Sequence, residues 1–399
     1  MDKPFLYTLI TLTAGGLLIL ASASIAVSQR NFGTMGYYTL RQFVFGVCGG
    51  AIAFLVTYHI PYRLWKKAAV PLMILSLVLL ALLFIPEISF AAGGARRWLR
   101  FGHFSFQPSE ILKFSFIIYL ASWLDARRRD VASIAYGFIP FILMLAIVGA
   151  FLVMQPDIGM LGVILVGAGM IYFLGGGLVS QMTTLAIFGL SILFLLIRLA
   201  PYRVARVLVF LNPGIDPQGI GYQMQQALIA IGSGGFFGRG FGQGAQKYYY
   251  LPEVLGDSIF AAFSEETGFL GATLLIGALL FFLWRGCAIA KRAPDSFGML
   301  LASGLVSIVL LQAFINMAAI SGLLPLTGIP LPFVSYGSTA FVVNSAGTCA
   351  WYVSSWWRAD HTVAFSSAGF FSSITATGKP FTNITTSGRR VCCPSETVN

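Results

Sequence analysis

Charge is the property that this sequence has least of. Only 10% of its 399 residues are charged, whereas 57% are hydrophobic. Soluble domains carry about 25% charged residues, so a fold of this size with a fully hydrated surface is excluded. The ranges 131–156, 158–197 and 296–357 contain no charged residue. Because a membrane span needs about 20 apolar residues, these runs predict a polytopic membrane protein without a sizeable soluble domain.

Histidine and cysteine are also scarce, with three and five residues. No metal-ligand spacing occurs among them, which argues against a histidine–cysteine metal site. Cys48, Cys287 and Cys349 fall in apolar stretches, where a small buried hydrophobe is the expected role. Cys392-Cys393 leave palmitoylation open as an alternative. The net charge of +11 suits contact with anionic membrane lipid. Most basic residues fall in short loops between apolar segments, so nucleic acid is not an expected partner.

The apolar segments predict an all-α membrane protein with about ten transmembrane helices. The first segment is longer than the apolar region of a signal peptide, so we expect it to stay attached as a span. The predicted segments are 4–27, 42–58, 68–90, 109–124, 136–154, 160–175, 182–200, 266–284, 299–320 and 339–357. Together they form one transmembrane domain over 1–357. The Ser- and Thr-rich remainder, 358–399, has no helical period and is expected to be a disordered cytoplasmic tail.

The distribution of Lys and Arg predicts that both termini are cytoplasmic. With the N-terminus inside, the basic clusters near 63–67, 127–129 and 285–292 fall on the inner side, as positively charged loops prefer. The short outer loop 91–107 breaks this rule, because it carries Arg96, Arg97 and Arg100. These arginines suggest an anionic ligand on the outer side. Binding of outer-leaflet headgroups is the alternative.

A long outer loop, 201–265, separates the seventh and eighth segments. Its Gly-rich stretch 232–240 offers backbone N–H groups of the kind that bind anions, although this signal is weak. The acids are more informative, because four of the 14 in the chain lie between Glu253 and Glu266. An acid held at the membrane boundary in a partly apolar site can have a raised pKa and act as a general base. A solvated acidic rim is the alternative. If the segment is helical, Glu253 and Asp257 share a face, and Glu265 and Glu266 fall in the first turn of the eighth span.

Three further ionisable residues fall at or inside predicted spans. Glu110 and Lys113 are three positions apart at the start of the fourth segment. Ionisable groups inside a membrane are costly and often functional, but a structural ion pair is the alternative. Asp157 follows Pro156 at the junction of the fifth and sixth segments, where it could also be a helix N-cap.

Six motifs, in order along residues 1 to about 350, resemble the SEDS family (shape, elongation, division and sporulation). They are Gly94-Ala95-Arg96-Arg97-Trp98-Leu99, Phe106-Gln107-Pro108-Ser109-Glu110-Ile111-Leu112-Lys113, Gln155-Pro156-Asp157-Ile158-Gly159, Gly221-Tyr222-Gln223 with Ile229-Ala230-Ile231-Gly232-Ser233-Gly234-Gly235, Leu251-Pro252-Glu253 with Asp257-Ser258-Ile259-Phe260, and Leu326-Thr327-Gly328-Ile329-Pro330-Leu331-Pro332-Phe333-Val334-Ser335-Tyr336-Gly337. Each motif alone is short, but the ordered set on ten predicted spans is specific.

The resemblance implies a peptidoglycan glycosyltransferase of the bacterial cytoplasmic (inner) membrane, with its active site on the extracytoplasmic side. Its substrate would be lipid II, and undecaprenyl diphosphate would be released. The family's essential acid maps to Asp257, which we predict to be the catalytic base. A divalent cation, Mg²⁺ or Mn²⁺, is a further expectation, with unknown ligands. The predicted substrate-binding residues are Arg96, Arg97, Trp98, Gln107, Ser109, Glu110, Lys113, Asp157, Gln223, Arg239, Lys247, Glu253 and Ser335.

The run from Gly238 to Glu253 looks closer to the division type of the family, FtsW, than to the elongation type, RodA. A class B penicillin-binding transpeptidase and other division proteins are then the expected partners. The sequence departs from the family where Leu255-Gly256 replace a common His-Thr and Ser258 replaces a common Phe. A lipid II transporter remains an alternative, although no internal repeat of the kind many transporters show is found. A division scaffold without chemistry is another, and it predicts that Asp257 is dispensable.

Overall fold

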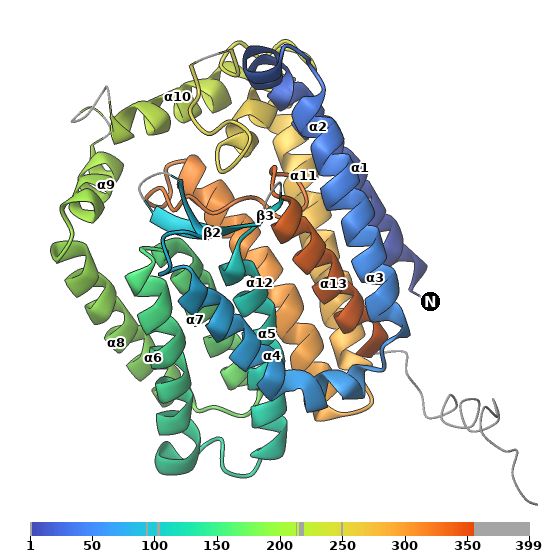
Figure 1. Ribbon diagram of the computed structural model, residues 1–399, viewed down its shortest axis with the longest axis vertical. Helices are drawn as coiled ribbons and strands as arrows, with labels where there is room; N and C mark the ends of the chain where they lie inside the picture. Colours follow the sequence, from blue (N-terminus) through green and yellow to red (C-terminus); the bar gives the residue numbers. More distant parts are fainter. Residues whose placement is uncertain are drawn as a thin grey trace, which may run out of the picture. The chain divides into compact units, whose positions relative to one another are not determined.

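The computed structural model describes residues 2–92, 95–101, 104–212, 214, 219–248 and 250–354. Helices dominate it (Figure 1). In chain order the elements are α1 (Lys3–Phe32), α2 (Tyr37–Arg41), the π-helix η1 (Gln42–Cys48), α3 (Gly49–His59), α4 (Tyr62–Leu82), β1 (Ser89–Ala92), β2 (Ala95–Phe101), β3 (Phe104–Phe106), α5 (Pro108–Ala126), the π-helix η2 (Ile134–Phe138), α6 (Ile139–Met154), α7 (Ile158–Leu174), α8 (Val179–Arg198), α9 (Pro201–Leu211), α10 (Ile220–Ser233), α11 (Ile259–Lys291), α12 (Ser296–Ile320) and α13 (Ser338–Ser354). The predicted tail, 358–399, lies outside the described residues.

Seven helical stretches in the described chain are long and apolar enough to cross a membrane: α1, α2 to α3, α4, η2 to α6, α8, α11 and α12. Each coincides with a predicted segment, which confirms a multi-pass membrane protein. The other three predicted segments coincide with α5, α7 and α13. Helix α7 is apolar but shorter, and α5 carries Glu110, Lys113 and Asp125. The count of ten spans therefore stays a prediction.

A small sheet is the feature that the all-α prediction missed. Strands β1, β2 and β3 pair antiparallel in that order, with Ser89 opposite Leu99 and Phe101 opposite Phe104. The third predicted segment, 68–90, was therefore misplaced, because α4 spans Tyr62–Leu82 and residues 89–92 belong to β1. Apolar residues such as Phe90 satisfy a hydropathy window equally well in a strand and in a helix.

The long loop 201–265 also contains regular structure that the sequence did not suggest. It holds α9 and α10, and α11 begins at Ile259. Glu265 and Glu266 therefore lie in the second turn of α11, where both are buried, and the prediction that they occupy a first turn was wrong. Glu253 and Asp257 lie in consecutive turns before α11. The condition for a shared helical face is therefore not met.

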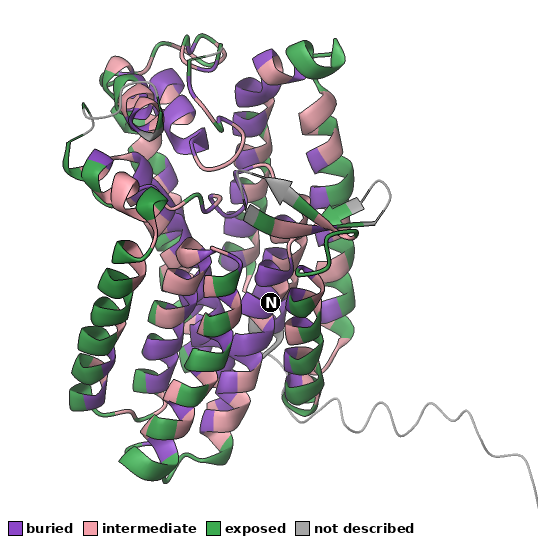
Figure 2. Ribbon diagram, turned by 60° about the vertical axis from the view of Figure 1, so that its left-hand side comes forward, coloured by how far each residue is buried: buried purple, intermediate pink, exposed green. Residues whose placement is uncertain are grey.

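Helix α12 forms the centre of the bundle and positions the site. In the most apolar 18-residue stretch of α12, 78% is buried inside the protein, against 11% for the corresponding stretch of α8. It packs against α5, α7, α11 and α13, and Figure 2 shows the buried residues gathered among these helices. Large apolar side chains on α8, such as Ile187 and Phe194, are exposed instead, as a lipid-facing helix requires. Asn316 of α12 is thus held next to two segments, the one between α10 and α11 and the loop that follows α12.

A break in α11 at Gly268 ties the loop 234–248 to the bundle. Gly268 has φ 65° and ψ −162°, and a Cβ there would lie 2.3 Å from the amide nitrogen of Gly238. The loop fills the break, because Phe269 N–H donates to the Gly235 carbonyl at 2.9 Å and Leu270 N–H donates to the Phe236 carbonyl at 3.1 Å. Only glycine fits this backbone conformation and close approach together.

Candidate active site

Asp257 is a half-buried acid in the turn that leads into α11. Loss of solvation and, after it, the nearby negative charge of Glu253 together raise its pKa to about 6, against the opposing effect of a hydrogen bond from Gln223. The Gln223 amide on α10 donates to Asp257 Oδ1 at 3.2 Å. A carboxyl with this pKa is largely ionised at neutral pH yet remains basic enough to accept a proton.

The loop 253–258 is held in place by α12 and by the loop that follows it. Asn316 of α12 donates to the carbonyls of Asp257 at 2.9 Å and Ile329 at 2.7 Å. Ser335 donates its hydroxyl to the Gly256 carbonyl at 2.5 Å. Its neighbour Tyr336 donates its N–H to the Leu255 carbonyl at 2.8 Å. Ser335, predicted to bind substrate, therefore braces the backbone next to Asp257.

Space is left next to the second carboxylate oxygen of Asp257. Gly328 lies beside it with φ +70°, and a Cβ at Gly328 would be 3.9 Å from Asp257 Oδ2. No other heavy atom of the described protein, outside the adjoining residues, lies within 4 Å of that Cβ position. Oδ2 therefore borders room in which a substrate hydroxyl can be placed.

Arg206 lies close enough to this acid and to a second arginine to interact with both. Arg206 of α9 donates to the Leu326 carbonyl at 3.1 Å, and Arg97 of β2 donates to the Pro156 carbonyl. The pKa of Arg206 is lowered by burial and by the Arg97 guanidinium, while Asp257 raises it. Arg97 Nε is buried without a hydrogen-bond partner in the described part of the chain. Two like charges near each other favour an anionic ligand of more than one negative charge.

The alternation of a strand explains why Arg97, and not Arg96, joins this site. Successive side chains of β2 point to opposite faces. Leu99, two positions from Arg97, is fully buried, whereas Arg96 is exposed and Trp98 is half-buried. Arg96 and Trp98 therefore lie on the other face from Arg97.

Asp157 is the N-cap of α7, as the structural alternative predicted. Its Oδ1 accepts the Met160 N–H at 3.3 Å. Its Oδ2 accepts the Ser109 hydroxyl at 3.4 Å, and the Gln107 amide donates to that hydroxyl at 3.0 Å. The contact of Arg97 with Pro156 places this predicted group next to the arginine pair.

Glu110 and Lys113 form an ion pair inside the bundle. Lys113 Nζ lies 2.7 Å from Glu110 Oε2 and also donates to Gln312 of α12 at 2.5 Å and Asn344 of α13 at 3.2 Å. Gln312 in turn donates to the Pro330 carbonyl at 3.0 Å. Both charged side chains are almost completely buried. These contacts favour the structural alternative for the pair.

Lys247 and Arg239 are bound to the acids of α11 and not to Asp257. Lys247 Nζ lies 2.6 Å from Glu266, 3.0 Å from the Ser22 hydroxyl and 2.8 Å from the Gly242 carbonyl, and it is buried. Arg239 is largely exposed, 3.6 Å from the Glu265 carboxylate. The structure does not bring these two predicted substrate-binding residues into contact with Asp257.

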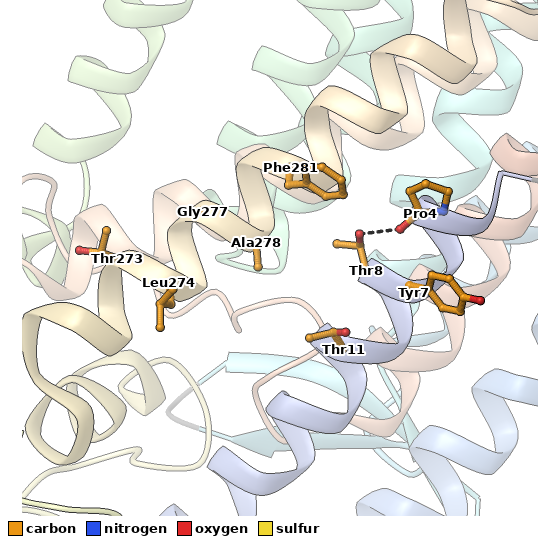
Figure 3. A pocket seen from close by; sticks show the side chains of 9 residues that line it. All are labelled: Pro4, Tyr7, Thr8, Thr11, Thr273, Leu274, Gly277, Ala278 and Phe281. Atoms are coloured by element: carbon orange, nitrogen blue, oxygen red, sulfur yellow. Dashed lines mark hydrogen bonds between the residues drawn. The ribbon is translucent and has the colours of Figure 1, made fainter.

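A hollow of about 550 Å³ lies elsewhere, between α1 and α11 (Figure 3). Its lining is apolar apart from Tyr7 and three threonines, of which Thr8 donates its hydroxyl to the Pro4 carbonyl at 2.8 Å. It contains no carboxylate, lysine or arginine. The region around Asp257 is therefore the stronger candidate for chemistry.

Comparison with known proteins shows the family to which this chain belongs. A family model described as a cell cycle protein, and named for FtsW, RodA and SpoVE, matches residues 3–350. The chain belongs to the FtsW/RodA/SpoVE family. This membership confirms the SEDS resemblance in the sequence.

Curated members of the FtsW/RodA/SpoVE family are similar over most of their length. The probable peptidoglycan glycosyltransferase FtsW of Trichlorobacter lovleyi is 37% identical over 352 residues, covering 86% of this chain and 90% of that protein. Stage V sporulation protein E of Bacillus subtilis is 39% identical over 340 residues, covering 84% and 91%.

Solved structures agree with this assignment. A protein from a peptidoglycan synthase complex, described for the coordination of polymerisation and crosslinking, superposes with a TM-score of 0.73 at 26% identity, covering 88% of this chain and 97% of that one. The rod shape determining protein RodA of Thermus thermophilus gives 0.65 at 26% identity, covering 88% and 95%.

The sequence of this FtsW/RodA/SpoVE member did not indicate three residues of the site, Arg206, Asn316 and Gly328. Arg206 looked like one basic residue among several in a long loop. Asn316 looked like a polar position in an apolar helix, and Gly328 like a turn glycine. A buried amide in a spanning helix is the one signal that could have indicated Asn316, because such groups need partners.

Proposed function

We propose that this protein polymerises peptidoglycan glycan strands by joining lipid II disaccharides with release of undecaprenyl diphosphate. The observation that carries the proposal is Asp257, a half-buried carboxyl with a pKa of about 6. Space borders one of its oxygens. Arg206 lies close enough to interact with Asp257, and Arg97 close enough to interact with Arg206. Relatives named as peptidoglycan glycosyltransferases support it.

In the proposed reaction, Asp257 Oδ2 accepts the proton of the acceptor sugar hydroxyl. The hydroxyl oxygen then forms a bond to the anomeric carbon of the donor sugar. The bond between that carbon and the diphosphate oxygen breaks, and its electron pair leaves with the lipid diphosphate. Arg97 and Arg206 would stabilise the negative charge that develops there, which is commonly a large part of catalysis.

A divalent cation fits the donors that are present. Glu253 and Asp257 supply two carboxylates close enough for one to raise the pKa of the other. No cluster of three metal-binding side chains occurs in the part of the chain that the structure describes. Mg²⁺ is often held by one or two carboxylates together with substrate phosphates. When bound, the cation would neutralise charge on the diphosphate.

The proposed setting is the bacterial inner membrane, with both termini cytoplasmic and Asp257 on the extracytoplasmic side. The basic clusters near 63–67, 127–129 and 285–292 support this orientation. A class B penicillin-binding transpeptidase and other division proteins are the proposed partners, supported by the similarity to a member of a synthase complex. We favour the division role over elongation, because several relatives are named FtsW.

The test is the formation of glycan polymer from lipid II by the full-length protein purified with its transpeptidase partner and Mg²⁺. Polymer that requires Asp257 supports the enzyme. Lipid II crossing a vesicle membrane without polymer would instead establish a transporter. Equal polymer from wild type and Asp257→Asn would rule out the base.

Loss of the Arg206 charge is expected to weaken binding of the diphosphate. Arg206→Met should raise the KM for lipid II about 10- to 100-fold, because a charge-assisted contact to phosphate is lost. Arg203→Met is the matched control on the same helix. Arg203 donates to the Tyr202 hydroxyl and the Leu196 carbonyl, which are both close to it in the sequence. Equal KM values for the two variants would remove Arg206 from the site.

Glu253→Gln is expected to shift the pH dependence of polymerisation. The base must be deprotonated, so wild-type activity should fall as the pH drops through about 6. Glu253 raises the pKa of Asp257, and its neutralisation therefore lowers that pKa. The acid limb of kcat/KM should move to lower pH. An unchanged limb, measured with metal saturating, would show that Glu253 does not act on the base.

A further inference from the structure

Ser258 occupies the N-cap position of α11 but does not cap the helix. An N-cap serine normally accepts a hydrogen bond from a backbone N–H of the first turn. Ser258 makes no such side-chain bond. Its hydroxyl, fully buried, lies 3.1 Å from the Gln223 amide nitrogen and 3.5 Å from Asp257 Oδ1. The Ser258 side chain therefore contacts Gln223 and Asp257 and does not cap α11.

One amide ties the serine and the acid together. Gln223 Nε2 carries two hydrogens, and it donates to Asp257 Oδ1 at 3.2 Å and to Ser258 Oγ at 3.1 Å. The Ser258 hydroxyl hydrogen is then free to point at Oδ1. Gln223, Ser258 and Asp257 close a ring of hydrogen bonds on one carboxylate oxygen.

The two carboxylate oxygens of Asp257 therefore have different surroundings. The side-chain hydrogen bonds that it accepts from the described residues all end on Oδ1. Oδ2 borders the room beside Gly328. Both donors come from elements fixed by the bundle, Gln223 from α10 and Ser258 from the start of α11.

We propose that Gln223 and Ser258 are positioning residues that hold Oδ1 of Asp257 and so present Oδ2 to the acceptor hydroxyl. The proposal rests on the proposed function, because it assigns which oxygen accepts the proton. It revises the prediction that Gln223 binds substrate. It also gives a use to the serine that stands where the family commonly has Phe.

Loss of these donors has a definite consequence for the rate. A proton acceptor must lie within hydrogen-bond reach of its proton. A carboxylate that can rotate freely should therefore lower kcat and leave the KM for lipid II unchanged.

The experiment measures kcat and KM of lipid II polymerisation for the full-length protein with its transpeptidase partner. Gln223→Met and Ser258→Ala each remove a donor, whereas Ser258→Thr keeps the hydroxyl. Gln226→Met on the same helix is the matched control. We expect Gln223→Met and Ser258→Ala to lower kcat about fivefold, with an unchanged KM. Ser258→Thr should recover most of the wild-type rate.

A raised KM at unchanged kcat would overturn the proposal and return Gln223 to substrate binding. A loss of kcat in Ser258→Ala that Ser258→Thr does not recover would indicate a merely structural role and also overturn it. If Ser258→Ala does not fold, Gln223→Met decides the question alone. Failure of the proposed function looks different, because Asp257→Asn would then keep wild-type activity.

Discussion

Asp257→Asn is expected to reduce the rate of lipid II polymerisation about 10²- to 10⁴-fold, the usual contribution of a general base. The amide has nearly the shape of the carboxyl but cannot accept the proton. Polymer length and yield from purified complex, with lipid II and Mg²⁺ saturating, measure the effect. Glu87→Gln is the matched control, because Glu87 is an exposed acid in the turn before β1.

The folded state should tolerate Asp257→Asn, so that lost activity reports lost chemistry. The pKa of Asp257 is raised from 3.8 to about 6 in the folded protein. An acid with a raised folded pKa loses stabilising free energy as the pH rises from its unfolded pKa through its folded pKa. A neutral asparagine avoids that loss at pH 7. Thermal unfolding of the variant at or above the wild-type temperature is therefore expected. A variant that folds and polymerises normally would contradict the base assignment.

Lys247→Met is expected to destabilise the protein by about 3–5 kcal/mol, because it leaves a buried carboxylate without its partner. Lys247 and Glu266 are 1% and 5% exposed and 2.6 Å apart. The Gly242 N–H and the Ser22 hydroxyl would still contact Glu266, but no cation would remain. Equilibrium unfolding in detergent or lipid nanodiscs measures the loss.

Two variants test whether Lys247 neutralises the buried Glu266 carboxylate or binds the substrate diphosphate. The double variant Lys247→Met with Glu266→Gln removes both charges and should recover much of the lost stability. Arg239→Met, in the same loop, should cost less than about 1 kcal/mol, since its side chain is 46% exposed and its partner Glu265 lies 3.6 Å away. If Lys247→Met kept full stability but lost affinity for lipid II, the lysine would be a substrate contact after all.

Hydropathy indicated the multi-pass helical architecture. The order of the motifs indicated the family and selected Asp257 as the candidate base. An apolar run long enough to span a membrane is a local property, because every backbone group in lipid must bond within its own helix. The alternation that separates Arg97 from Arg96 is local too, but hydropathy concealed the strand that produces it. Hydropathy also failed to reveal the amphipathic helices α9 and α10, because they lie in a stretch that is neither strongly apolar nor strongly charged.

Only the tertiary structure decided which groups meet the acid. Arg239 and Lys247 are the nearer cations to Asp257 in sequence, yet Glu265 and Glu266 bind them. Arg206 of α9 interacts with the acid instead, and Arg97 of β2 interacts with Arg206. Asn316 and Gly328 join the site only because α12 brings the following loop back over residues 253–258. A pairing between distant residues depends on how helices pack, and the spacing of residues along the chain contains no information about that packing.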